Sequence, residues 1–163
     1  MSDFALAIPV ILHREGGYVN NPHDEGEETN FGISKRSYPN VDIRNLTKEG
    51  AAAIYQRDFW NAYGYGRLAV QGIGTKIFDM AVNLGPRTAH KLAQEAAGAA
   101  PDGELGNDSI QRLNAQPALP LLRQLRSLLV DHYHEIVSLN PKDYEFLKGW
   151  LSRANDEDGL ITV

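Results

Sequence analysis

Apolar residues recur every three or four positions over most of the chain, which predicts a largely helical protein. In the first segment Phe4, Ile8 and Ile11 are spaced by four and three residues, so they fall on one face of a helix. Glu15 follows at the next spacing of four and continues the same stripe. The pair at 16–17 is Gly-Gly, which is typical of the end of a helix because glycine adopts the closing backbone conformation at little cost.

The same periodicity predicts six later helices, over residues 47–62, 73–84, 87–97, 107–113, 119–139 and 141–153. Residues 18–40 are different, because Asn, Pro, Asp and Gly gather there and favour turns. Within this region Thr29–Ile33 is predicted to form a short strand, and Tyr18–Tyr38 a small irregular hairpin. We therefore predict a mostly α fold with one small β-hairpin region near the N-terminus.

Length and charge narrow the classes of function. The 163 residues suffice for one domain, or for two small lobes that share a core. A formal net charge of -5 argues against a protein held on nucleic acid or on anionic lipid by general charge. There is no cysteine, which excludes disulfides and thiolate metal sites.

The apolar stretch at 4–12 follows an acid rather than basic residues, unlike a secretion signal. We expect the protein to stay cytoplasmic or to be released by another route.

Two carboxylates near the N-terminus sit in contrasting surroundings. Glu15 ends an apolar stripe, where partial desolvation favours the protonated acid. Asp24 follows nine residues later in a polar, glycine-containing turn, where it should stay ionised. Such a pair matches the pattern for cleavage of a glycosidic bond, and the Thr29 hydroxyl could orient a water molecule. The spacing alone leaves open that these acids only solvate a surface loop.

The residues themselves carry a more specific signal. The stretch REGGYVNNPHDEGEETNFGIS resembles the opening motif of glycoside hydrolase family 108, a family of phage-type muramidases. Its pattern is Glu-Gly-Gly-Tyr, then Asn-x-Pro-x-Asp, then Gly-x-x-Thr-x-x-Gly-Ile. Glu27 stands where the family often has a second glycine. Later segments agree in order with the family: LTKEGAAAIYQRDFWNAYGYGRL, FDMAVNLGPRTAHKLAQEAAG, DGELGNDSIQRLN and EFLKGWLSRAN.

The resemblance implies a lysozyme-like α+β fold and roles for three residues. Glu15 would be the general acid that protonates the leaving oxygen. Asp24 would stabilise positive charge on the sugar and help to activate water, and Thr29 would hold that water. This trio implies inversion at the sugar carbon. Residues 1–70 would form the catalytic lobe, and residues 71–163 a helical lobe resembling a peptidoglycan-binding region, both packed as one globular unit.

The implied activity is that of an N-acetylmuramidase, which hydrolyses the β-1,4 bond between N-acetylmuramic acid and N-acetylglucosamine in peptidoglycan. The resemblance also implies a bacteriophage endolysin that causes host lysis without a cofactor. We expect a monomer that waits in the host cytoplasm, makes no stable membrane association, and reaches periplasmic peptidoglycan after a holin opens the membrane. The alternatives are a lytic transglycosylase, and a peptidoglycan-binding or secretion-accessory protein without turnover.

Three further residues are predicted to bind substrate. Tyr18 and Tyr63 are the aromatic residues best placed to stack on sugar rings, whereas at least one of Phe59 and Trp60 is expected in the core. Asn83 lies near a helix end, from which it either reaches the cleft or caps the helix locally. No metal is expected, because DGELGNDS (102–109) lacks the alternating ligands of a calcium loop.

Overall fold

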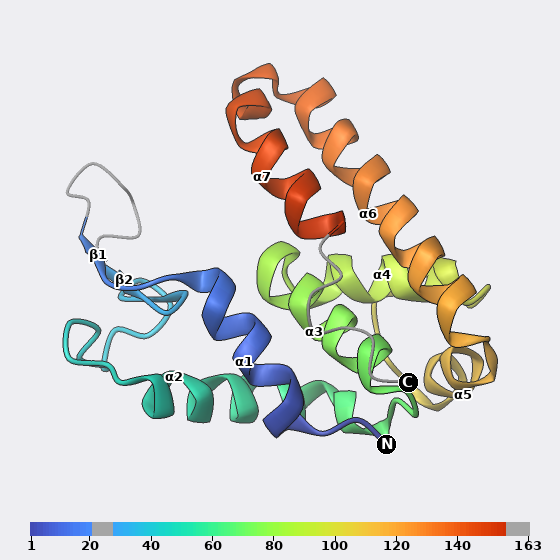
Figure 1. Ribbon diagram of the computed structural model, residues 1–163, viewed down its shortest axis with the longest axis horizontal. Helices are drawn as coiled ribbons and strands as arrows, with labels where there is room; N and C mark the ends of the chain where they lie inside the picture. Colours follow the sequence, from blue (N-terminus) through green and yellow to red (C-terminus); the bar gives the residue numbers. More distant parts are fainter. Residues whose placement is uncertain (21–27, 156–163) are drawn as a thin grey trace.

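The computed structural model describes residues 1–20 and 28–155 (Figure 1). Over these residues the chain has seven α-helices and a three-stranded antiparallel sheet, so the predicted mostly α, lysozyme-like fold is confirmed. The helices are α1 (Phe4–Glu15), α2 (Lys48–Tyr55), α3 (Gln71–Leu84), α4 (Pro86–Ala96), α5 (Asn107–Ala115), α6 (Ala118–Leu139) and α7 (Tyr144–Asn155). The strands are β1 (Val19–Asn20), β2 (Glu28–Asn30) and β3 (Ile33–Ser34).

Helix α1 forms as its sequence predicts. The Asp3 carboxylate caps the N-terminus by accepting a hydrogen bond from the Ala5 amide at 2.8 Å. Ile8 and Ile11 are buried on the predicted face. Gly16 ends the helix with a φ of 70°, a conformation that glycine adopts most readily. Glu15 is thus the last helical residue, and the chain turns away directly after it.

Helix α2 begins where predicted, since the Thr47 hydroxyl accepts a hydrogen bond from the Gly50 amide at 3.1 Å. Its continuation, Gln56–Asn61, is π-helical, which a 3.6-residue period cannot predict because each π turn holds more residues. Trp60 is buried at 5% exposure and Phe59 is half-buried. The expectation that at least one of these two rings belongs to the core is therefore confirmed.

The sheet corrects one prediction. The single strand expected over residues 29–33 is in fact two strands, β2 and β3, joined by a turn at Phe31 and Gly32. Both turn residues have positive φ, 50° and 76°, as in the tight hairpin turns that match strand twist. The sheet order is β1-β2-β3, with Thr29 opposite Val19 on one side and Ser34 on the other.

Helix α3 is the centre of the helical part. It is buried from Gly72 to Ala81 and packs against α1, α4 and α6. Figure 1 shows α6 and α7 as an antiparallel pair that rises above α3. The last predicted helix begins one turn late, because Pro141–Asp143 forms a 3-10 turn before α7. None of the helices in the described part of the chain is long and apolar enough to cross a bilayer.

Two helical glycines give a matched test of this packing. A Cβ at Gly149 in α7 would meet no atom within 4 Å, whereas a Cβ at Gly74 in α3 would lie 2.7 Å from the Ser2 Cβ and against its Oγ. That hydroxyl donates to Leu68 O at 2.9 Å, and moving it would break this hydrogen bond. Gly149→Ala is expected to stabilise the protein by about 0.5–1 kcal/mol, and Gly74→Ala to destabilise it by about 1–3 kcal/mol. Urea unfolding of both variants checks this, and equal effects would contradict it.

Candidate functional site

Glu15 occupies a fixed place between the β2–β3 turn and helix α7. Its side chain is 18% exposed, and its Oε1 accepts a hydrogen bond from the Arg153 Nη2 at 2.8 Å. On the other side, a Cβ built on Gly32 would lie only 2.8 Å from the Glu15 Oε2. A loose, solvated surface acid would show neither contact, so the surface-loop alternative does not describe Glu15.

The hairpin turn explains why glycine follows Phe31. Gly32 has a φ of +76°, and a side chain there would strike both Glu15 and the Tyr55 hydroxyl. That hydroxyl donates to Phe31 O at 2.9 Å and so ties the turn to α2. Burial, and then the negative charge of Glu15, raise the pKa of Tyr55. Tyr55 therefore keeps its proton and continues to hold the turn against Glu15.

A buried ion network supports the opposite side of Glu15. Asp79, in α3, is 1% exposed and accepts from the Arg14 Nη1 at 2.5 Å and from the Arg153 Nη2 at 2.8 Å. Burial alone would lower the pKa of Arg153, but Asp79 and then Glu15 outweigh burial and raise it. Arg153 therefore stays charged and bridges Asp79 to Glu15. Asp79 thus joins α3 to Arg14 in α1 and to Arg153 in α7.

Lys76 adds a further positive charge to this network. It is 2% exposed, and its ammonium donates to the Ala154 carbonyl at 3.0 Å at the end of α7. Burial lowers the pKa of Lys76 to about 8, partly offset by Asp79, while Arg14 and Arg153 are among the cations that lower it further. Among the residues that the structure describes, Arg14, Arg153 and the protonated Lys76 thus cluster around Asp79 and Glu15.

The buried lysine gives a pH test. The folded protein releases the Lys76 proton near pH 8, whereas the unfolded chain holds it to about 10.5. Between these values the unfolded state binds more protons, so stability from this group rises with pH. The stability of the wild type minus that of Lys76→Met is expected to increase by about 2 kcal/mol between pH 7.5 and 10. Urea unfolding of both proteins at several pH values measures this difference. The titration of tyrosines contributes to the stability of both proteins and therefore cancels. A flat difference would contradict the burial of a charged lysine.

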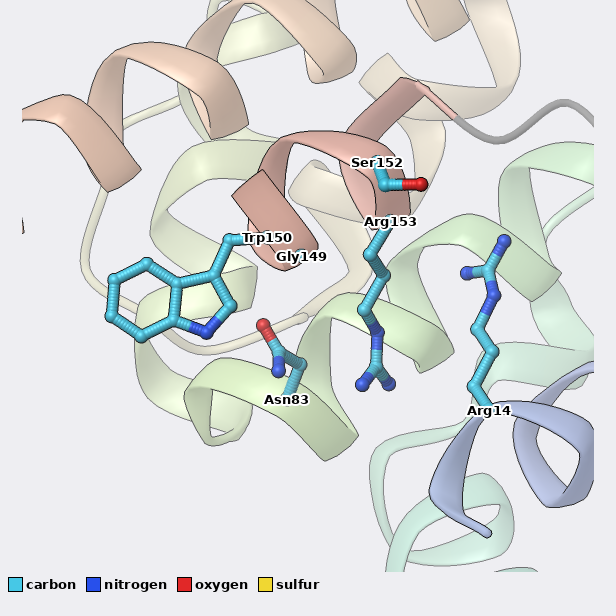
Figure 2. Close-up of a pocket in the computed structure, with 6 residues that line it drawn as sticks. All are labelled: Arg14, Asn83, Gly149, Trp150, Ser152 and Arg153. Carbon is cyan, nitrogen blue, oxygen red and sulfur yellow. The ribbon is translucent and has the colours of Figure 1, made fainter. Parts of the chain in front are cut away.

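A cavity of about 370 Å³ lies next to the ion network. Its lining residues come from α1, α3 and α7: Arg14, Asn83, Gly149, Trp150, Ser152 and Arg153. Figure 2 shows Trp150 and Arg14 at opposite ends, with Asn83 and Arg153 between them. Arg153 therefore links the cavity to the candidate acid, because it lines the cavity and also donates to Glu15.

The structure places two of the three predicted catalytic residues. Glu15 lies at the site just described. Asp24 falls outside the described residues. Thr29 lies in the middle strand β2, whose turn touches Glu15, and its role as a water holder stays a prediction.

The predicted substrate-binding residues do not gather at one place. Asn83 lines the cavity beside Glu15, and its Oδ1 accepts from the Tyr133 hydroxyl at 2.6 Å. Tyr18 is 38% exposed beside the sheet, where its hydroxyl donates to Glu28 at 2.8 Å. Tyr63 lines a second cavity of about 400 Å³, between residues 61–67 and the loop at 104–106. The sugar-binding roles of all three stay predictions.

The sequence does not reveal the residues that are far from Glu15 in the chain but lie near it in the fold. No local pattern singles out Arg153 or Trp150. Arg14 precedes Glu15 but belongs to no motif that singles it out. One usable signal is Asp79 within the apolar run IFDMAV, because a carboxylate buried in a helix requires cationic partners. Over residues 1–20 and 28–155 no cluster of His, Asp and Glu side chains is arranged to hold a metal ion.

Comparisons with known proteins agree with this architecture. Residues 8–85 match the family model described as Glycosyl hydrolase 108. The solved "Structure of Brucella abortus SagA" is similar to this chain, with a TM-score of 0.72 and 26% sequence identity, over 95% of this chain and 97% of that one. A search of curated proteins finds no match. Glu15, Gly32 and Asp79 all fall inside the matched residues, whereas Arg153 falls outside them. Residues 8–85 therefore carry a domain of glycosyl hydrolase family 108.

Proposed function

We propose that this glycosyl hydrolase is an N-acetylmuramidase that hydrolyses the β-1,4 bond between N-acetylmuramic acid and N-acetylglucosamine in peptidoglycan. The observation that carries the proposal is the placement of Glu15. Its carboxyl group is held from both sides, by the Gly32 turn and by Arg153, and Arg153 itself lines a cavity. Such fixed geometry is what a general acid requires, because proton transfer depends on the reach and angle of the donor.

The chemistry assigned to the site has two halves. Glu15 protonates the oxygen of the leaving sugar as the glycosidic bond breaks. Asp24 activates a water molecule on the opposite face of the sugar, and Thr29 holds that water. We propose inversion, which requires about 6.5–9.5 Å between the two carboxyl groups. Arg153 is a positioning residue, since it acts through Glu15.

Analysis of the products made by the wild-type protein tests the proposal. Purified peptidoglycan is digested, and its fragments are identified by mass spectrometry. Fragments ending in reducing N-acetylmuramic acid are expected. Anhydromuramic ends would instead indicate a lytic transglycosylase, in which one acid works without a water-holding partner. Binding without any fragments would indicate a wall-binding or secretion-accessory protein.

We further propose that the protein acts as an endolysin. It would accumulate in the host cytoplasm as a monomer and reach peptidoglycan only after a holin permeabilises the membrane. Expression in a bacterial cytoplasm is expected to leave cells intact until the membrane is opened with chloroform, after which turbidity falls rapidly. Lysis without any permeabilisation would contradict the holin-dependent route.

A further inference from the structure

We propose that the cavity between α1, α3 and α7 binds the carboxylate-bearing side arm of a muramoyl group. The inference rests on the proposed function, since it names a part of the same substrate and where that part binds. The relevant chemistry is a carboxylate close to a sugar. Two sources within peptidoglycan supply it, namely the lactyl group of muramic acid and the peptide attached to that group.

The side chains that line the cavity are suited to binding a carboxylate. Arg14 and Arg153 supply guanidinium groups, Asn83 an amide and Ser152 a hydroxyl. Guanidinium groups suit carboxylates because their donors match the two oxygens. The cavity of about 370 Å³ lies within the usual range for small-molecule sites. It is large enough for the side arm of one sugar but not for a glycan strand.

The charge around the cavity favours an anion. Within residues 1–20 and 28–155, the cations Arg14, Lys76 and Arg153 cluster around the carboxylates Asp79 and Glu15. The chain as a whole has a net charge of -5, so this cluster stands out against an acidic protein. A bound carboxylate would add a counter-charge to these cations in a partly buried site, where charges interact strongly.

The end of the cavity away from Arg14 is aromatic. Trp150 lines it and stacks with Tyr133 and with Phe146, whose ring centroids are 5.3 Å and 5.9 Å away. Tyr133 in turn holds Asn83 through the 2.6 Å hydrogen bond. A rigid aromatic wall opposite a cationic one suits a ligand that has an apolar sugar or methyl face and a carboxylate. A simple inorganic anion would use only the cationic end.

Binding of small fragments to the wild-type protein tests the site without turnover. The probe is the indole N–H signal of Trp150 in a ¹⁵N correlation spectrum, with the core residue Trp60 as an internal reference. N-acetylmuramic acid, which has a free lactyl carboxylate, and N-acetylmuramoyl-L-alanyl-D-isoglutamine, in which that group is an amide and the peptide carries the carboxylate, are titrated separately. N-acetylglucosamine is the control without a carboxylate.

A saturable shift of Trp150, but not of Trp60, with either muramoyl compound and not with N-acetylglucosamine is the expected result. A response to N-acetylmuramic acid alone assigns the site to the lactyl carboxylate, and a response to the dipeptide assigns it to the peptide. No response to either compound, or an equal response to N-acetylglucosamine, would overturn the inference.

A matched pair of variants tests the role of charge. Ser152 is exposed on α7 and lines the cavity, so substitutions there should fold. Ser152→Asp places a negative charge on the wall, and Ser152→Asn adds the same bulk without charge. The dissociation constant for the responding muramoyl compound is expected to be about tenfold higher for Ser152→Asp than for Ser152→Asn. Equal constants would overturn the inference, even if the wild type cleaves peptidoglycan. Conversely, a Trp150 response in a protein that releases no fragments would disprove the hydrolase proposal alone.

Discussion

Replacing Asp79 with asparagine is expected to destabilise the protein by about 3–5 kcal/mol, because it leaves buried cations without their shared counter-charge. Asp79 is 1% exposed, and the side chains of its partners Arg14 and Arg153 are only 9% and 16% exposed. Asparagine keeps the shape of the side chain but supplies no charge. Lys76 would also lose the partner that offsets its burial. Urea unfolding at pH 7, followed by far-UV circular dichroism, measures the loss.

A surface pair provides the control for this substitution. Asp108 is 72% exposed and pairs with Arg112 one turn along α5 at 2.8 Å. Exposed pairs of this kind contribute little, because water already solvates both charges, so Asp108→Asn should change stability by less than about 0.5 kcal/mol. If Asp79→Asn also stayed within about 1 kcal/mol of the wild type, the network would not have the structural role assigned to it here.

The parts of the fold that sequence predicted well are those governed by local rules. Helix α1 has a capping acid, one apolar stripe and a glycine end within a short stretch, and its observed bounds match. Helix α4 begins at Pro86, one residue before the predicted start at 87, because proline is favourable in a first helical turn. The Glu-Gly-Gly-Tyr motif singled out Glu15 without any tertiary information, and the catalytic role of Glu15 stays a prediction. Each of these signals depends on residues only a few positions apart.

The parts that sequence did not predict depend on residues distant in the chain. Arg153 contacts Glu15 across 138 positions, and nothing local distinguishes it from other arginines on helix surfaces. The turn at Phe31 was also missed, because positive φ at a phenylalanine is uncommon and the surrounding residues favour a strand. Here the tie from Tyr55 to the Phe31 carbonyl contributes to a conformation that local preference alone would not select. The cavity beside Glu15 arises only once α1, α3 and α7 pack together.

Replacing Glu15 with glutamine is expected to reduce the rate of peptidoglycan cleavage by about 10²–10⁴-fold, because it removes the proton donor and keeps the side-chain shape. The glutamine amide would retain an oxygen for the Arg153 Nη2, which now lies 2.8 Å from the carboxylate. Arg153 would also keep its bonds to Asp79. The fold should therefore survive, and the loss should appear in kcat more than in KM, because the proton moves only in the transition state. Release of soluble muramoyl fragments per unit time measures the effect.

Two comparisons separate chemistry from structure in this experiment. Glu95→Gln makes the same substitution at an exposed position of α4 and should leave the rate unchanged. Arg153→Lys keeps a positive charge near Glu15 but loses the planar group that binds Asp79 and Glu15 together, so an intermediate loss of rate is expected. If Glu15 only supported the fold, Glu15→Gln would lose stability in proportion to its loss of rate. A folded Glu15→Gln protein that retained more than a tenth of the wild-type rate would exclude Glu15 as the general acid, and the contact with Arg153 would then serve only to join α1 to α7.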